Sequence, residues 1–335
     1  MTLPADHPPV AKPRVGLLLV NLGTPDAPEP GAVKRYLAEF LSDPRVVEIP
    51  AILWQPILRG IILNVRPKKS AHAYQQVWTD QGSPLAAITR RQAEALAARF
   101  GDRVMVDHAM RYGRPAIGDR LRALKAAGCT RILVAPLYPQ YCAATTATVV
   151  DAVGAALKDM RWQPAIRTLP AYHDDPAYIG AVAASVRQEL AARQFEPDAI
   201  LATFHGMPAR TLSLGDPYHC QCLKTARLLS ETLGRPVRAS FQSRFGRAKW
   251  LEPYTETVLA ALPREGIRKV AVVAPGFSAD CLETLEEIAM RGKETFLEAG
   301  GEAFEYLPCL NDSPTGVDML DQLMQRELAG WISNA

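Results

Sequence analysis

The sequence predicts an α/β protein made of two similar Rossmann-like domains, each a parallel sheet flanked by helices, with a cleft between them. Short apolar runs alternate with alanine- and leucine-rich stretches along the chain, a pattern typical of parallel sheets covered by helices. The segments that begin at Gly128 and Gly266 also resemble each other, since each carries one or two basic residues, then an apolar run, then Ala-Pro. This weak internal repeat indicates two halves of one architecture.

The predicted strands follow from the apolar runs, taken in chain order. They span residues 15–20, 104–106, 132–135, 166–169, 200–204, 239–241 and 270–274. The stretches between them have the composition of helices, which gives the alternation of strand and helix that a parallel sheet requires.

The two domains are predicted at residues 14–165 and 166–311. A helical stretch ends at the Arg161-Trp-Gln-Pro segment and a new strand begins there, which sets the boundary. The last helix, 318–331, is expected to cross back and complete the first domain. A chain of 335 residues has room for two domains of ordinary size.

Composition excludes several classes of protein. Hydrophobic residues make up 48% of the chain, charged residues 22%, and the net charge is only +3, so we expect no nucleic-acid partner. Six cysteines without the spacing of a secreted scaffold favour a reducing compartment. Residues 1–14 lack the apolar core of a signal peptide and are predicted to form a short disordered lead, which favours a cytoplasmic location.

Residues 50–69 form an unusual segment, because an apolar run ends there in a basic cluster. A proline and an arginine interrupt the run, and it is shorter than the about 20 apolar residues that span a bilayer. Two interpretations stay open. The segment is either an amphipathic core helix or an exposed apolar lip that contacts a membrane surface and a flat ligand. The second interpretation would place the protein at the periphery of the inner membrane.

Polar and aromatic side chains follow most of the predicted strands. They are Asn21, Arg111, Tyr112, Tyr138, His205, Gln242 and Glu283. Ligands of open α/β sheets bind beyond the carboxyl ends of the strands, so these residues predict a site that both halves line. His205 is the strongest candidate, because imidazole can take a proton or hold a metal near neutral pH. A histidine that only caps a turn is the alternative.

A series of short motifs appears in order along the chain. They are Asn21-Leu-Gly-Thr-Pro, Gly82-Ser-Pro, Met110-Arg-Tyr, Tyr138-Pro-Gln-Tyr, Phe204-His-Gly-Met-Pro, Gly215-Asp-Pro-Tyr, Gln242-Ser-Arg with Trp250, and the segment 278–287. Together they resemble the ferrochelatase family, which inserts ferrous iron into a porphyrin, over residues 15–311. Ser213 departs from the charged or amide residue that is usual there. Cys281 stands where animal members carry a second histidine, which removes one candidate metal ligand.

The resemblance implies a bacterial-type ferrochelatase, a lyase of the terminal step of haem biosynthesis. Protoporphyrin IX is the expected substrate, and coproporphyrin III stays open. His205 and Glu283 are the implied catalytic residues and the ligands of the Fe²⁺ substrate, with either one as the proton acceptor. The residues implied around the ring are Leu22, Arg66, Lys69, Tyr74, Arg111, Tyr112, Tyr138, Gln242 and Trp250. The chemistry itself requires no cofactor.

Three carboxylates near the end of the chain suggest a relay. If residues 280–291 are helical, Asp280, Glu283 and Glu287 lie on one face. Such a stripe could carry protons or pass on metal, which suits a reaction that needs both a base and a metal ligand. A solvated first helical turn, favoured by the helix dipole, is the alternative.

The cysteines leave a second metal site open. Some members of the family hold a [2Fe–2S] cluster through four cysteines, and Cys142, Cys220 and Cys222 are the candidates here. The sequence offers no persuasive fourth donor, so free thiols are the alternative.

Two rival functions stay open. One is a cobalt or nickel chelatase of a related tetrapyrrole, and the other is a non-catalytic tetrapyrrole or haem carrier, which would have no use for Glu283 opposite His205. Nucleotide binding is disfavoured, since no glycine-rich phosphate motif follows a strand. Monomer and dimer are both compatible with the sequence.

Overall fold

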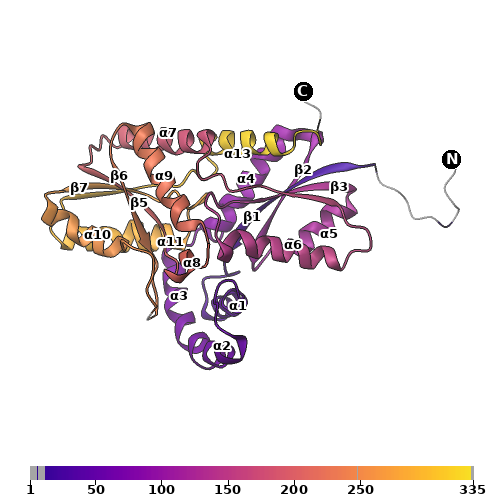
Figure 1. Ribbon diagram of the computed structural model, residues 1–335, viewed down its shortest axis with the longest axis horizontal. Helices are drawn as coiled ribbons and strands as arrows, with labels where there is room; N and C mark the ends of the chain where they lie inside the picture. Colours follow the sequence, from indigo (N-terminus) through magenta and orange to yellow (C-terminus); the bar gives the residue numbers. More distant parts are fainter. Residues whose placement is uncertain (1–5, 7–11, 247, 333–335) are drawn as a thin grey trace.

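The computed structural model of the chain describes residue 6, residues 12–246 and residues 248–332. The lead predicted at residues 1–14 lies almost entirely outside the described residues. Two four-stranded parallel sheets lie side by side, one formed by the first half of the chain and one by the second (Figure 1).

The two sheets have the same strand order. The first consists of β1 (Arg14–Gly23), β2 (Met105–Tyr112), β3 (Cys129–Pro136) and β4 (Ala165–Thr168), in the order β2-β1-β3-β4. The second consists of β5 (Ala199–His205), β6 (Val237–Gln242), β7 (Lys269–Val273) and β8 (Ala303–Leu307), in the order β6-β5-β7-β8. The predicted pair of similar Rossmann-like units is therefore confirmed.

The boundary predicted at residue 165 is wrong by one strand. Arg131 pairs with Ala165 and Val134 with Thr168, so β4 is the edge strand of the first sheet. The sequence of β4 identifies it as a strand but does not say which sheet it joins. The chain passes to the second half through residues 169–175, which lead into α7 (Pro176–Ala192).

Each sheet is covered on both faces by helices. The first has α4 (Pro84–Phe100) on one face and α5 (Ile117–Ala126) with α6 (Thr148–Lys158) on the other, because alternate residues of β1 point to opposite faces. The second has α7 and α9 (Tyr218–Leu233) on one face and α10 (Thr255–Ala261) with α12 (Lys293–Glu298) on the other. Shorter helical segments are α8 (Arg210–Ser213), η2 (Gly101–Arg103) and η4 (Leu262–Glu265).

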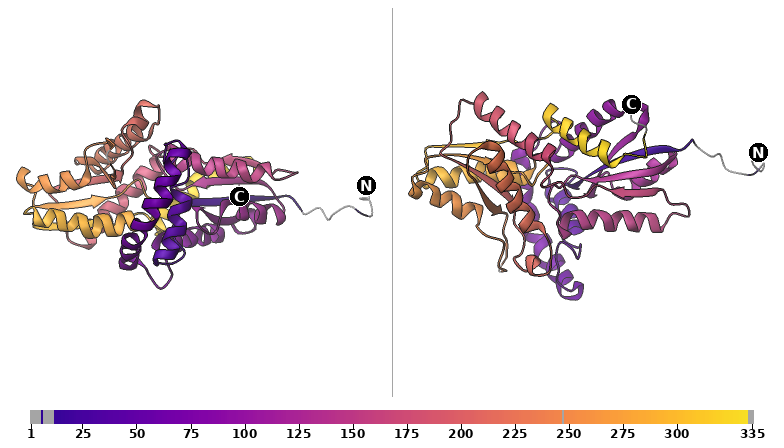
Figure 2. Two further views of the ribbon diagram at one scale, coloured as in Figure 1. Left: turned by 90° about the horizontal axis from the view of Figure 1, so that it is seen from below. Right: turned by 45° about the horizontal axis from the view of Figure 1, so that its top comes forward.

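The last helix, α13 (Pro314–Glu327), begins four residues before the predicted start at 318. Ser313 caps it by accepting a hydrogen bond from the Gly316 amide. The helix packs against both α7 and α4 (Figures 1 and 2). One apolar core consequently runs through both halves of the molecule.

The segment predicted at residues 50–69 lies in a helical projection outside the two sheets (Figure 1). The projection comprises α1 (Pro30–Phe40), α2 (Ala51–Ile57), the π-helix η1 (Leu58–Ile62) and α3 (Leu63–Val77). No residue of α2 is buried, and the side chains of Ile52 and Val65 are 83% and 68% exposed. An exposed apolar lip therefore describes the segment better than a core helix does. None of the helices in the described part of the chain is both long and apolar enough to cross a bilayer.

Candidate active site

His205 is the last residue of β5, the strand at the middle of the second sheet. Its Nδ1 lies 2.7 Å from the Gly206 carbonyl oxygen. A carbonyl oxygen only accepts hydrogen bonds, so Nδ1 is the donor and Nε2 is the ring nitrogen left for another partner. Gly206 approaches the next strand closely, because a Cβ there would lie 2.5 Å from the Gln242 carbonyl oxygen. The turn that presents the imidazole therefore needs glycine.

Glu287 is a half-buried carboxylate close to His205. Ser243 holds it with two hydrogen bonds, from its backbone N–H to Oε1 at 2.7 Å and from its hydroxyl to Oε2 at 2.5 Å. Burial raises the pKa of Glu287, while the Ser243 hydrogen bonds and the charge of His205 oppose that rise. The structure thus brings a carboxyl group with an elevated pKa next to the imidazole of His205.

Glu283 lies in α11 (Leu282–Thr284), which continues as the π-helix η5 (Leu285–Gly292). The side-chain amide of Gln242 donates to the Glu283 carbonyl oxygen at 2.8 Å and accepts from the Thr203 hydroxyl at 2.8 Å. Gln242 is therefore buried and has both amide ends occupied. Sequence analysis placed it among the ring-binding residues, but here it fixes the position of Glu283.

The helix expected at residues 280–291 begins at Leu282, so Asp280 lies outside it. The Asp280 carboxylate accepts hydrogen bonds from Tyr306 at 2.6 Å, from Asn311 at 2.6 Å and from Thr284 at 2.9 Å. These partners draw Asp280 into the loop before the helix and away from the predicted stripe. The described stripe consists of Glu283 and Glu287.

Tyr74 approaches Glu283 from the helical projection, since α3 packs against α11 and η5. Burial above all, and then the charge of Glu283, raises the pKa of the Tyr74 phenol. Leu22 is half-buried just before the end of β1, and it packs on the same apolar cluster as Tyr74. These two predicted ring-binding residues therefore come from the first half and lie together.

Arg111 and Tyr112 share one partner that sequence analysis missed. Arg111 forms an ion pair with Asp43, and the Tyr112 hydroxyl donates to the same carboxylate at 2.9 Å. Arg111 also donates to the Thr148 carbonyl oxygen at 2.8 Å. Both predicted ring-binding side chains are thus engaged by the protein, and the only sequence signal for Asp43 is its place in a Ser-Asp-Pro turn.

Tyr138 and Trp250, unlike Arg111 and Tyr112, have polar atoms that the described part of the protein leaves without a hydrogen bond. The Tyr138 hydroxyl and the Trp250 Nε1 are buried, and neither has a hydrogen-bond partner among the described residues. Buried polar atoms are nearly always paired in native proteins, so each is available to a ligand atom or a water molecule.

Arg66 and Lys69 lie on α3 with no carboxylate partner in the described part of the chain. The Arg66 guanidinium carbon lies 5.3 Å from the centroid of the Phe245 ring, and desolvation lowers its pKa. Lys69 is exposed. The basic end of the lip therefore presents two cations that no acidic residue neutralises.

Comparison with known proteins decides the family. The Ferrochelatase family model matches residues 14–328. A curated relative named Ferrochelatase, from Azoarcus sp. (strain BH72), is 57% identical over 98% of this chain and 92% of its own length. Another of that name, from Rhizobium meliloti (strain 1021), is 53% identical over 98% of both chains. The chain belongs to the ferrochelatase family. The ferrochelatase predicted from the sequence motifs is confirmed.

Solved structures agree with a ferrochelatase at the level of the fold. The structure titled SirB from Bacillus subtilis with Fe3+ superposes with a TM-score of 0.58 at 15% identity, over 95% of this chain and 97% of that one. CbiX, described as the terminal enzyme for biosynthesis of sirohaem in denitrifying bacteria, gives 0.53 at 15% identity, over 94% and 100%. The chelatase-like arrangement of two sheets is therefore shared with these proteins.

The three cysteines named as candidate cluster ligands differ in exposure. Cys142 and Cys222 are buried, and burial raises the pKa of both thiols, whereas Cys220 is exposed. Across residues 12–246 and 248–332, no three His, Cys, Asp or Glu side chains converge as metal ligands.

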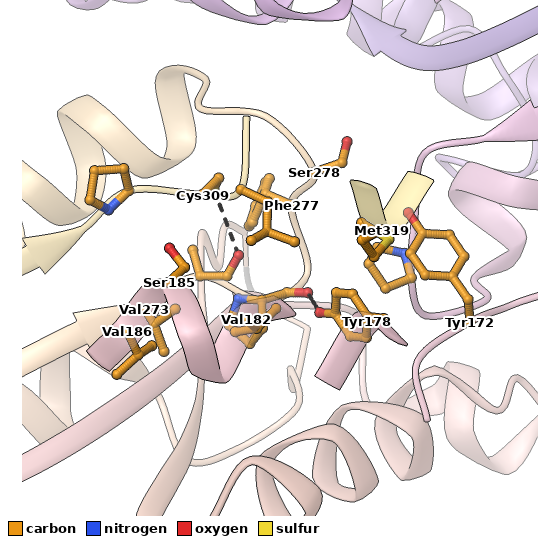
Figure 3. Close-up of a pocket in the computed structure, with 15 residues that line it drawn as sticks. Tyr172, Tyr178, Val182, Ser185, Val186, Val273, Phe277, Ser278, Cys309 and Met319 are labelled. Carbon is orange, nitrogen blue, oxygen red and sulfur yellow. Dashed lines mark hydrogen bonds between the residues drawn. The ribbon is translucent and has the colours of Figure 1, made fainter. Parts of the chain in front are cut away.

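A cavity of about 20 Å³ lies apart from these residues, in the seam between the halves of the ferrochelatase fold (Figure 3). Tyr178 and Cys309 line it and hydrogen-bond to the carbonyl oxygens of Pro275 and Ala274, respectively. Tyr172 and Ser278 also line it, and neither hydroxyl has a hydrogen-bond partner among the described residues. Its size suits about one water molecule, so it is not a porphyrin site.

Proposed function

We propose that this ferrochelatase inserts Fe²⁺ into protoporphyrin IX, with His205 and Glu283 as the catalytic residues and Glu287 as the proton relay. The observation that best supports this proposal is the proximity of His205, whose Nδ1 is held by the Gly206 carbonyl oxygen, to the Ser243-bound carboxyl group of Glu287. A carrier needs neither a proton acceptor nor a carboxyl group with an elevated pKa.

The reaction removes two pyrrole protons and replaces them with one divalent iron. His205 Nε2, the ring nitrogen that does not bind the Gly206 carbonyl oxygen, accepts one pyrrole proton, and it accepts the second after the first has been passed on. Glu287 takes that proton onward, since an elevated carboxyl pKa brings it closer to the pKa of imidazole. Glu283 guides Fe²⁺ to the ring with a hard oxygen ligand, and its helix position is fixed by Gln242.

The ring itself contacts the open side chains of the site. Tyr138 and Trp250 offer aromatic faces and unpaired polar atoms, and Leu22 packs from the end of β1. Arg66 and Lys69 bind the carboxylates of the substrate, because both are cations without an acidic partner among the described residues. The occupied groups Arg111, Tyr112 and Gln242 shape the wall behind them.

The lip docks on a lipid surface, from which a poorly soluble porphyrin can enter. This part of the proposal is supported by the exposed apolar side chains of α2 and η1 and by Lys68 and Lys69 at the basic end. Such a segment lies in the interface plane, with its cations at anionic headgroups. No resident cluster takes part in the proposed reaction.

The test is anaerobic haem formation from Fe²⁺ and protoporphyrin IX. We expect His205→Ala and Glu283→Gln to lose about a hundredfold or more in kcat, the scale of a lost general base, while still binding porphyrin. His72→Ala, on the exposed side of α3, is the matched control and keeps parent activity. Parent-like turnover of Glu283→Gln, or stoichiometric binding without turnover, would overturn the mechanism. Faster insertion of Co²⁺ or Ni²⁺ into a sirohydrochlorin-type ring would favour the related chelatase.

A further inference from the structure

Phe245 is an apolar residue in an unusual place. It lies in the loop that follows β6, and 48% of its side chain is exposed. Its ring is tilted against that of Trp250, with 4.8 Å between the centroids. Trp250 is itself buried and forms a β-bridge with Pro208, in the turn that follows His205. Phe245 therefore packs against a buried aromatic residue of the site.

The outer face of Phe245 is covered by a cation from the other half of the chain. The guanidinium of Arg66 lies over the ring at 5.3 Å, although Arg66 belongs to α3. No hydrogen bond or ion pair joins Arg66 to any other described residue. The aromatic ring is thus the one identified partner of this guanidinium in the part of the chain that the structure describes.

An aromatic partner has a different consequence from an acidic one. Asp43 binds Arg111 and neutralises it. Phe245 attracts a cation through its ring electrons, so it restrains the guanidinium and leaves all of its N–H donors available. A long arginine side chain loses much rotamer freedom when it binds an anion, and a platform that orders it beforehand lowers that cost.

We propose that Phe245 is a positioning residue, which holds Arg66 in the orientation that binds a carboxylate of the porphyrin. The inference rests on the proposed function, in which Arg66 takes such a carboxylate. Because Arg66 comes from the first half and Phe245 from the second, carboxylate binding also draws the two sides of the site together. Desolvation already lowers the pKa of Arg66, so a bound carboxylate would restore a favourable charge environment.

The experiment compares Phe245→Leu and Phe245→Tyr with the parent, using quenching of porphyrin fluorescence for Kd and haem formation for KM and kcat. We expect Phe245→Leu to raise Kd and KM for protoporphyrin IX about three- to tenfold, the range of a partly exposed cation–π contact, with kcat nearly unchanged. Phe245→Tyr keeps the aromatic face and restores parent values. Trp162→Leu is the matched control, because Trp162 is also an exposed aromatic near a cation, Lys125, at 6.0 Å.

The dimethyl ester of protoporphyrin IX separates positioning from simple packing. Without a carboxylate for Arg66, the parent and Phe245→Leu should bind the ester equally. An equal loss with acid and ester would overturn the inference, as would unchanged binding of the acid by Phe245→Leu. In a double-mutant cycle, Arg66→Gln should remove the effect of Phe245→Leu, and additive losses would contradict the proposed coupling. If the parent binds acid and ester equally, Arg66 does not bind a carboxylate, and both the proposed role of Arg66 and the proposed role of Phe245 fail. Porphyrin binding without iron insertion would contradict only the proposed reaction.

Discussion

Ser243 is the residue whose backbone is most unusual in the site. Its φ is 63°, a left-handed conformation that non-glycine residues seldom adopt. In this conformation its N–H and hydroxyl both reach the Glu287 carboxylate. Backbone strain of this kind costs about 1–3 kcal/mol and persists where the surroundings hold it. We therefore assign Ser243 the task of setting the proton affinity of Glu287.

Removing the Ser243 hydroxyl should make Glu287 harder to ionise. The hydrogen bonds from Ser243 lower the pKa of Glu287, so Ser243→Ala raises that pKa further. If the relay works as a carboxylate, activity rises with pH through this pKa, and the acidic limb of the kcat/KM profile moves to higher pH. At a pH on that limb we expect about a tenfold loss, the value of one hydrogen bond to a charged group, and little loss at alkaline pH.

A second substitution at the same position distinguishes the effect of losing the hydroxyl from the effect of backbone strain. Ser243→Gly also lacks the hydroxyl, but glycine adopts a positive φ without cost. Both variants should shift the acidic limb in the same direction. A profile that coincides with that of the parent would contradict the role of Ser243.

The sequence predicted which residues form the candidate site better than it predicted what each residue contacts. His205 and Glu283 were predicted because they follow strand ends and match family motifs, and their catalytic roles stay a prediction. Asp43 was missed because its partner Arg111 is 68 residues away, and no local sequence pattern predicts an ion pair over that separation. Gln242 was predicted at the ring because it follows a strand end and matches a family motif, yet Thr203 and Glu283 occupy its side-chain amide.

At the scale of elements, π-helical segments gather around the site. In the described residues they are η1 in the lip, η3 (Ala143–Ala147) after the Tyr138 loop, and η5 directly after Glu283. A π-helix closes i→i+5 hydrogen bonds and is often found at functional sites. The α-helical period predicted that Glu283 and Glu287 lie on the same face of a helix. It did not predict that the segment is π-helical or that the helix begins at Leu282.

Strand prediction missed one strand, β8. β8 has no apolar run, because only two of its five residues are buried and Glu305 interrupts the pattern. β1 and β5 lie inside their sheets and carry strong apolar runs, since helices cover them on both faces. An edge position alone does not hide a strand, because β2, β4 and β6 are also edge strands and were predicted.

The exposed apolar residues of the lip give a prediction about membrane binding. Ile52 and Leu53 are 83% and 61% exposed, so replacing both with glutamate should leave the fold intact. Each side chain that enters the lipid interface contributes up to about 1.5–3 kcal/mol, so we expect at least a tenfold loss of binding to anionic vesicles in a sedimentation assay. Val150→Glu on α6, which is 46% exposed, is the control. Equal binding of the double variant and the parent would contradict membrane docking.

At the scale of the whole molecule, the two halves are joined by more than the two chain crossings. Arg91 on α4 binds Asp312 in the second crossing with two hydrogen bonds, at 2.7 and 3.0 Å. Gln92 on the same helix donates to the carbonyl oxygens of Asn311 and Ser278 at 2.9 and 3.1 Å. Together with the shared apolar core, these contacts favour unfolding of both halves as one unit.

Gln92→Ala tests that cooperativity. The loss of two buried hydrogen bonds should lower the free energy of unfolding by about 2–3 kcal/mol. Urea titrations followed by circular dichroism and by tryptophan fluorescence should give one coincident transition in parent and variant. Gln163→Ala removes one exposed hydrogen bond to Leu157, and we expect it to change stability by less than about 0.5 kcal/mol. Two separate transitions in the parent would show that the halves unfold independently.

Helix α13 is the last element of the fold, yet it covers α4, which is made early. Val317, Leu320 and Met324 of α13 belong to the same core as Leu96 and Phe100 of α4. During translation the ribosome completes α4 well before α13, and at common elongation rates the interval is about ten to forty seconds. For that time the nascent first half exposes an apolar helix face, so it should engage chaperones that shield such surfaces until the end of the chain emerges.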